Sequence, residues 1–78
     1  MSIDYYLVSY EAKEALSVGR RSANGRPYLY CTVSEKFAQQ LERFMFRHTD
    51  SALHLIHDDL LNDLVCSDPD WVVQEEQR

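Results

Sequence analysis

The sequence predicts an α+β fold: a small three- to four-stranded antiparallel sheet in meander order, one amphipathic helix packed on it, and a short second C-terminal helix. Residues 1–33 are rich in β-branched and aromatic side chains and contain a turn signal, whereas residues 34–48 carry apolar side chains at helical spacing. A chain of 78 residues, 45% of them hydrophobic, suffices for one thin core. We expect a single domain over residues 1–73 and a frayed tail over residues 74–78.

Residues 1–10 are expected to form the first strand, because tyrosine and β-branched side chains suit a pleated sheet. Both alternating sets of side chains are apolar; one set is Ile3, Tyr5 and Leu7, and the other is Tyr6, Val8 and Tyr10. A strand that is apolar on both faces is typical of a central position in a sheet covered on two sides. We therefore place this strand in the middle of the sheet.

Residues 15–21 are expected to form a second, half-solvated strand, because Leu16 and Val18 alternate with Ser17 and Gly19. The Asn-Gly pair at positions 24 and 25 tolerates positive φ and suits a tight hairpin turn. A third strand is expected over residues 28–33, after a proline that can only begin a strand. Short connections leave consecutive strands adjacent, which predicts an antiparallel meander.

The first helix is expected to begin after Ser34, a good N-cap residue, with Glu35 placed where negative charge favours the helix dipole. Apolar and aromatic side chains then recur at helical spacing, at Phe37, Leu41, Phe44, Met45 and His48. This pattern predicts an amphipathic helix that ends near Thr49 and lies with its apolar stripe on the sheet.

Residues 53–65 fit two patterns, because leucine and histidine alternate at the start as in a strand while the apolar residues also fit one helix face. We favour a short strand over residues 53–57. Asp58 is then expected to cap a second helix that runs to about Cys66 and stops before Pro69, since the residue before proline resists helical geometry. Beyond Trp71 the chain is expected to fray or to pack back as an anchor.

Charge is the most informative feature for function. The net charge is −5, and residues 34–78 carry ten acidic groups against four basic ones, with no Lys or Arg between His48 and Gln77. We expect carboxylates of this run to form a partner-binding acidic face, made of Asp58, Asp59, Asp63, Asp68 and Asp70. A surface of one sign steers a basic partner and repels nucleic acid. The alternative is a solvated surface that serves only solubility.

Five tyrosines fall in the expected sheet, which is more than a thin core can bury with every hydroxyl hydrogen-bonded. We expect four of them to form a partner-binding aromatic face: Tyr6, Tyr10, Tyr28 and Tyr30. The alternative is a set of cross-strand aromatic pairs that are half exposed to water.

Two other kinds of site have weaker support. His54, His57 and Cys66 are residue types that bind zinc, but no second spaced ligand pair accompanies them, so we assign no metal site. Arg20, Arg21 and Arg26 lie near tyrosines, as in binders of single-stranded nucleic acid, yet three arginines are few in an acidic chain. Metal-binding or nucleic-acid-associated regulation is therefore the alternative function.

No nucleophile elbow, glycine-rich phosphate loop or paired-carboxylate motif is present, so we expect no enzyme activity and no cofactor. We expect a cytoplasmic protein that does not enter a membrane, because no long apolar run or basic leader occurs. The small core favours a homodimer. Size and charge together suggest a small acidic protein-interaction module that binds a basic protein surface, as an immunity protein, an antitoxin-like inhibitor or a phage-type inhibitor does.

Overall fold

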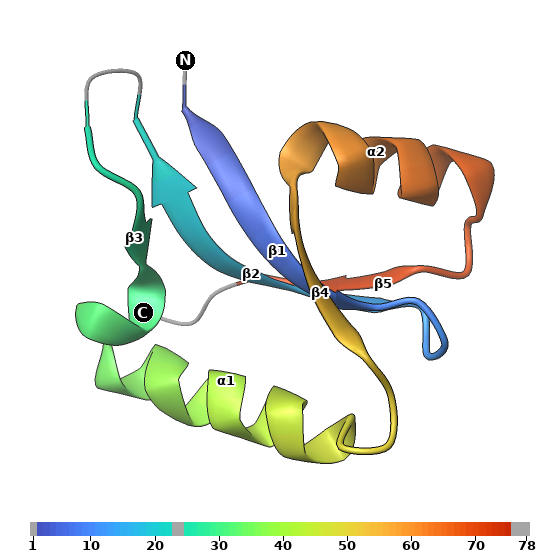
Figure 1. Cartoon of the computed structure of the whole chain (residues 1–78), viewed down its shortest axis with the longest axis horizontal. Helices are drawn as coiled ribbons and strands as arrows, with labels where there is room; N and C mark the ends of the chain where they lie inside the picture. Colours follow the sequence, from blue (N-terminus) through green and yellow to red (C-terminus); the bar gives the residue numbers. More distant parts are fainter. Residues whose placement is uncertain (1, 23–24, 76–78) are drawn as a thin grey trace.

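The computed structural model describes residues 2–22 and 25–75. Along these residues the elements are β1 (Ile3–Ser9), β2 (Glu14–Arg21), β3 (Tyr28–Leu29), the 3₁₀ helix η1 (Tyr30–Thr32), α1 (Glu35–Arg47), β4 (Leu53–His57), α2 (Asp58–Ser67) and β5 (Val72–Gln74) (Figure 1). The predicted α+β class, with a mainly antiparallel sheet and two helices, is confirmed. Neither helix has the length and apolar character needed to cross a membrane.

The sheet has the order β3-β2-β1-β4, so consecutive strands β1 to β3 form the expected meander and β1 lies in the middle. β1 pairs antiparallel with β2 on one side and with β4 on the other, and a register shift falls between Tyr5 and Tyr6. Two short strands pair with the edge of β2 that faces away from β1. β3 pairs antiparallel at Gly19 and Arg20, and β5 pairs in parallel with Glu14, Ala15 and Leu16.

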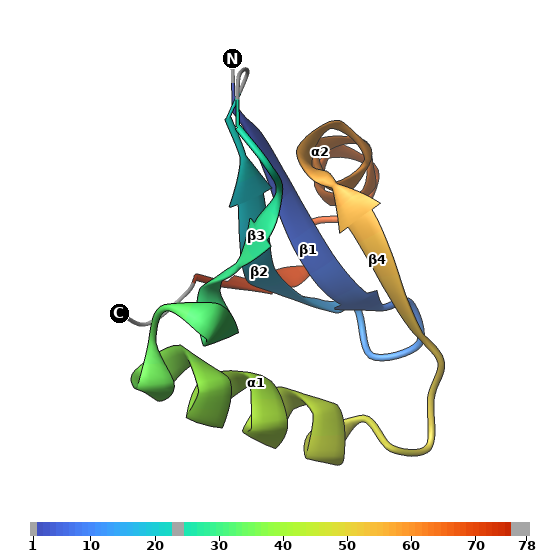
Figure 2. The same ribbon diagram turned by 60° about the vertical axis from the view of Figure 1, so that its left-hand side comes forward.

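The two faces of the sheet carry separate apolar cores, because α1 and α2 lie on opposite sides of it (Figure 2). The buried residues of the α1 core are Leu16, Val18, Tyr30, Phe37 and Phe44. The buried residues of the α2 core are Val8, Ala15, Ile56 and Leu61. Successive side chains of a strand point to opposite faces, so Leu7 packs on the first core while Val8 belongs to the second. The prediction of a central strand covered on both faces is confirmed.

The prediction of a half-solvated second strand is wrong. Residues 15–19 of β2 are all buried, and even Ser17 is only 2% exposed. The α2 core covers the face that carries Ala15, and β3 and β5 pair along the edge of β2 that faces away from β1, with the backbone of β3 close to Gly19.

The third strand is shorter than predicted. β3 holds only Tyr28 and Leu29, and the chain then turns into η1, which directs Tyr30 into the α1 core at 1% exposure. The hydroxyl of Thr32 donates to the carbonyl of Leu29 at 2.7 Å and stabilises this turn. Half of the predicted Asn-Gly hairpin turn, position 24, lies outside the described residues.

The first helix begins as predicted, since the Ser34 hydroxyl accepts a hydrogen bond from the Phe37 backbone N–H at 3.2 Å. Phe37 and Phe44 are buried, and each stabilises the fold by about 1.5–3 kcal/mol through removal from water. Met45 departs from the predicted stripe, because 48% of it is exposed. The helix ends at Arg47, within two residues of the predicted end.

The ambiguous segment is a strand followed directly by a helix, as favoured: β4 ends at His57 and α2 begins at Asp58. The predicted cap is wrong by one residue. His57 is the N-cap and makes no side-chain capping bond, while the Asp58 carboxylate accepts from the Asp59 backbone N–H at 2.9 Å inside the first turn. The helix ends at Ser67, with Asp68 as its C-cap, and so stops before Pro69 as predicted.

The chain beyond Trp71 packs back on the sheet. The Val72 backbone N–H donates to the Lys13 carbonyl at 2.9 Å, and β5 extends to Gln74, one residue past the expected domain end. The Gln40 side chain of α1 donates to the Glu75 carbonyl at 2.9 Å. The rest of the expected tail, residues 76–78, lies outside the described residues.

Candidate functional site

Three of the five predicted acidic residues lie on α2. Asp58 and Asp59 occupy its first turn and Asp63 follows one turn later, and the helix contains no Lys or Arg. Carboxylates in a first turn interact favourably with the helix dipole. Within residues 2–22 and 25–75, no cation forms an ion pair with any of the three. Their negative charge therefore remains available to a partner.

Asp68 is held by a cation from the other end of the chain. Its Oδ2 lies 2.6 Å from the Nζ of Lys13, and its Oδ1 accepts from the Asp70 backbone N–H at 3.0 Å. The hydrogen bond from Lys13, followed by that from Asp70, holds the pKa of the Asp68 carboxyl below its ordinary value. The same hydrogen bond raises the pKa of Lys13. Asp68 thus joins the end of α2 to the β1–β2 turn, and its charge is largely offset.

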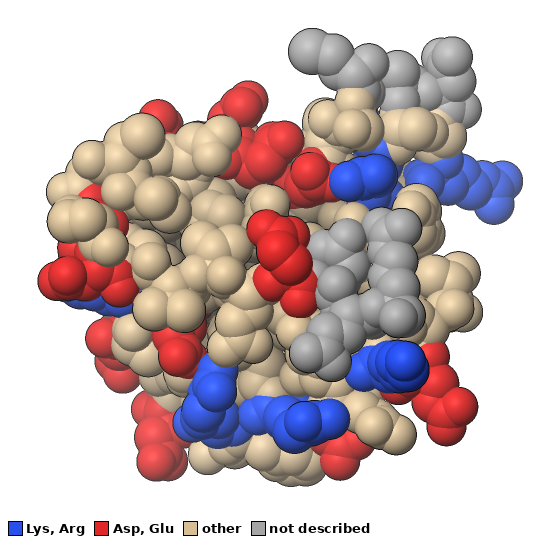
Figure 3. All heavy atoms as spheres, turned by 180° about the vertical axis from the view of Figure 1, so that it is seen from behind, with Lys and Arg blue, Asp and Glu red and all other residues tan. Residues whose placement is uncertain are grey.

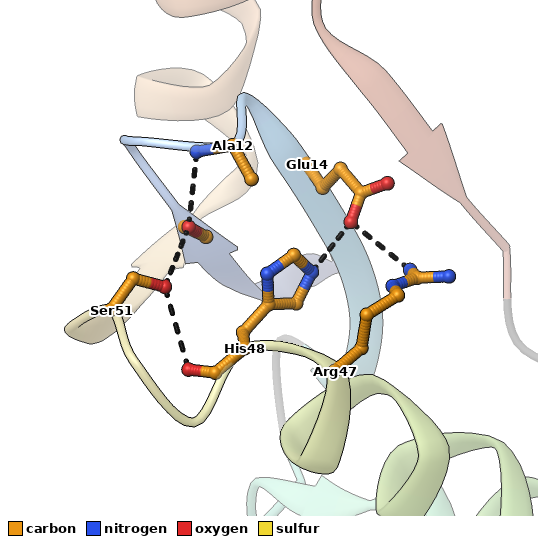
Figure 4. A network of polar contacts seen from close by, with 6 residues as sticks. Ala12, Glu14, Arg47, His48 and Ser51 are labelled. Carbon is orange, nitrogen blue, oxygen red and sulfur yellow. Dashed lines mark hydrogen bonds and ion pairs between the residues drawn. The ribbon is translucent and has the colours of Figure 1, made fainter.

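A second carboxylate, Glu14 at the start of β2, joins two basic side chains from the end of α1 (Figure 4). Its Oε2 lies 2.5 Å from Nε2 of the buried His48 and 3.0 Å from Nη2 of Arg47. The hydroxyls of Ser9 and Ser51 lie 3.2 Å apart beside this group, and the Ser51 hydroxyl donates to the His48 carbonyl at 3.4 Å. These contacts connect α1 to the sheet, so His48 is a structural residue.

The expected aromatic face does not form one surface. Tyr30 is buried in the α1 core, where its ring lies 5.6 Å from that of Phe37 and 5.8 Å from that of the exposed Tyr28. Tyr6 packs on the α2 core instead. The prediction fails because Tyr28 and Tyr30 lie at the α1 side while Tyr6 serves the opposite face.

Tyr10 lies at the far end of β1 and is 41% exposed. Its ring contacts His54 at 5.1 Å and meets Trp71 edge-on at 6.0 Å between centroids. This group ties the segment before β5 to β4. Tyr10 is thus partly occupied in packing and is separated from Tyr28, the other exposed member of the predicted set.

The histidines and cysteine of the weaker zinc hypothesis do not come together. Within the described part of the chain, the one group whose ligand atoms lie close enough for a metal is His57, Asp58 and Asp59, all within 4.8 Å of one another. This group contains neither His54 nor Cys66. Cys66 is a free, exposed thiol, and Cys31 is a free, half-buried one.

The hairpin arginines are not equivalent. Arg20 Nε lies 2.8 Å from Asp4 Oδ1, so its charge is offset by β1. Arg21 and Arg26 are exposed and form no ion pair with a described residue. Two isolated arginines make a small footprint for a phosphate backbone, because nucleic-acid affinity depends on the number of neutralised phosphates.

An apolar groove beside β4 is the feature that sequence reasoning missed. It encloses about 670 Å³ and is lined by Tyr5, Pro27, Tyr28, Leu29, Thr32 and Leu55. Leu55 is 61% exposed and Leu29 is 44% exposed. Apolar side chains that stay exposed to water around one groove are candidates for contact with a partner. Tyr5, Leu29 and Leu55 come from three different strands, and no local sequence pattern reveals that they line one groove.

β4 itself is an edge strand, because among the described residues it pairs with β1 alone. Its sequence, Leu-His-Leu-Ile-His, contains no proline, lysine or carboxylate, and no register shift occurs in its pairing with β1. In Figure 2 no helix or strand of the described residues lies beyond the side of β4 that faces away from β1. Natural sheets usually protect such an edge with charges, prolines or bulges, so the edge of β4 is open to a further strand.

Charges on the rear of the molecule are mixed. Figure 3 shows Asp and Glu at several separate places on this face, with Lys and Arg near them both in its lower half and at its upper right. The predicted acidic face is therefore less continuous than the linear run suggested. Its members without an ion pair to a described residue are Asp58, Asp59 and Asp63 of α2, together with Asp70. Comparison of the chain with protein-family models, curated proteins and solved structures gave no match.

Proposed function

We propose that the protein is a small acidic protein-interaction module that binds a basic protein surface through the carboxylates of α2. The observation that carries the proposal is that Asp58, Asp59 and Asp63 lie on one ten-residue helix without a cation on that helix and without a described ion-pair partner. Local charge of one sign accelerates encounter with a surface of opposite sign. An inhibitor or immunity-type role toward a nuclease or DNA-binding protein fits this chemistry, because such proteins present basic surfaces.

We centre the proposed acidic surface on the three carboxylates of α2 and leave Asp68 out of it. Asp68 interacts with Lys13 and contributes to stability. Asp70 donates only its backbone N–H to Asp68, and its exposed carboxylate forms no ion pair with a described residue. We therefore assign partner binding to the α2 carboxylates, keep Asp70 as a further member of the acidic surface, and leave Asp68 as a support of the chain reversal before β5.

A matched pair of variants tests this assignment on immobilised polylysine. The triple variant Asp58→Asn, Asp59→Asn, Asp63→Asn and the control Glu11→Gln, Glu35→Gln, Glu42→Gln remove the same charge, and both sets include exposed residues and a helix first turn. We expect the α2 variant to elute at lower salt than the control, because the carboxylates act together. Equal elution of the two variants contradicts a localised acidic surface.

Self-association stays part of the proposal. The described residues include nine buried hydrophobic core residues divided between two faces, and such a small core gains stability from a second subunit. Sedimentation equilibrium over a range of concentrations measures the oligomeric state. A monomer at all concentrations removes the homodimer from the proposal and leaves the α2 surface intact.

A further inference from the structure

We infer that the free edge of β4 binds an extended segment of the partner as an additional strand, and that this segment carries an alternating apolar centre with Lys or Arg at its ends. The inference rests on the proposed function, since it names the conformation and chemistry of the basic partner. Its first support is the open edge: Leu53–His57 pairs with β1 on one side only and lacks the usual protective residues.

The second support is the exposure of Leu55 at the centre of β4. Its side chain is 61% exposed although it lies on the sheet face that also carries the α1 core, where Leu53 packs. Along the edge of β4 that pairs with β1, Leu55 lies opposite Leu7. An added strand would place a side chain on the outer side of Leu55, and cross-strand apolar pairs stabilise a sheet.

The apolar groove continues this surface. Its lining residues include Leu55 of β4, Tyr5 of β1, and Tyr28 and Leu29 of β3. Alternate side chains of an added strand point to the same face, so the apolar ones would lie on Leu55 and shield the groove from water. The partner segment therefore needs apolar side chains at every second position.

The charges near β4 favour a segment of another protein over a second copy of this chain as the added strand. β4 itself carries no formal charge when its two histidines are neutral. Asp50 lies three residues before the strand, and Asp58 and Asp59 follow it directly. Pairing of two β4 strands about a two-fold axis at Leu55 would bring Asp50 of one copy toward Asp58 and Asp59 of the other, at both ends. Like charges disfavour that arrangement, whereas a segment with basic ends meets carboxylates at each end.

A peptide titration followed by amide NMR tests the inference. The probe is a nine-residue peptide with a Val-Thr-Val-Thr-Val centre and two lysines at each end. One control peptide has glutamates in place of the lysines, and another has alternate backbone nitrogens methylated on the pairing edge. We expect the lysine peptide to shift the amides of β4 and to bind on the order of tenfold tighter than either control at low salt.

Two variants of the protein complete the test. Leu55→Lys places a cation at the centre of the edge, where the side chain is already exposed, and should weaken binding about tenfold or more. Val72→Lys adds the same charge at the 52% exposed position on β5 and should leave binding unchanged. If both substitutions weaken peptide binding equally, the added positive charge alone explains the loss of affinity. That result overturns the strand-addition model.

The outcomes separate this inference from the proposed function. Binding of the lysine peptide with shifts confined to α2, or equal binding of the methylated peptide, overturns strand addition while the acidic surface stands. Concentration-dependent shifts of the β4 amides without peptide assign the edge to a second copy and also overturn it. If the two triple variants elute from polylysine at the same salt concentration, the proposed function itself is refuted.

Discussion

Substitution of Gly19 by alanine should destabilise the protein through one backbone contact. A Cβ at position 19 would lie 2.5 Å from the Tyr28 carbonyl oxygen, which is 0.9 Å inside the 3.4 Å lower limit of ordinary contact. Gly19 does not have positive φ, so alanine meets no conformational restriction of its own there. The obstacle is the close approach of β3, a backbone atom that cannot rotate away.

The loss of stability expected for Gly19→Ala is the difference between two opposing effects. Overpacking costs about 1–3 kcal/mol, and replacing glycine lowers the entropy of the unfolded chain by an equivalent of about 0.4–1 kcal/mol. The net expectation is a loss of about 1–2 kcal/mol from a total stability on the order of 4–12 kcal/mol for a chain of this length. At an m-value of about 1–1.5 kcal/mol/M, the urea midpoint falls by about 1 M.

Urea unfolding monitored by circular dichroism measures this change, and amide NMR locates it. The control is Gly25→Ala, where the added Cβ would meet the Ser22 hydroxyl at 2.2 Å, a rotatable side-chain atom that can move aside. We expect the control to stay within about 0.5 kcal/mol of the parent, as surface substitutions usually do. A Gly19→Ala protein with unchanged stability and unchanged Tyr28 and Leu29 amides would refute the argument that β3 lies too close to β2 to accept a side chain at position 19.

Two further predictions concern α1 and the ion pair of α2. Ser34→Ala removes the acceptor of the Phe37 N–H and should lower the free energy of unfolding by about 1 kcal/mol, measured by urea unfolding, whereas Ser34→Asp, which keeps an acceptor, should preserve it. The pKa of Asp68 is below its ordinary value of 3.8, so the stability it contributes is present above that value and is lost as pH falls through the lower folded-state pKa. Asp68→Asn should therefore be less stable than the parent at neutral pH and approach it in acid; a constant difference at all pH values would show that the ion pair is not the cause.

Local patterns predicted most of the secondary structure because the relevant signals are short-range. The Ser34 cap, the spacing of Phe37 and Phe44 and the alternation in residues 53–57 each involve neighbours in sequence, and the corresponding elements are present. The errors occur where packing overrides the pattern. Tyr30 had been placed in a strand, yet it is drawn into the α1 core by η1.

The candidate site was less predictable, because charge and exposure depend on residues distant in sequence. The acidic run was visible in the sequence, but Asp68 is offset by Lys13, which lies 55 residues earlier. The strand at Leu53–His57 was predicted, whereas its position at the sheet edge follows from its pairing with β1. No local signal indicates that Tyr5, Leu29 and Leu55 line one groove.

The amino-acid sequence by itself determined the α+β class, the central position of the first strand, the start of α1 and the absence of cations from the acidic run. Each depends on composition or on spacing within one element. Tertiary structure alone decided that both faces of β2 are buried, that Asp68 is paired while the carboxylates of α2 are not, and that β4 has an open edge. These properties require knowing which distant segments meet, and a short-range pattern does not contain that information.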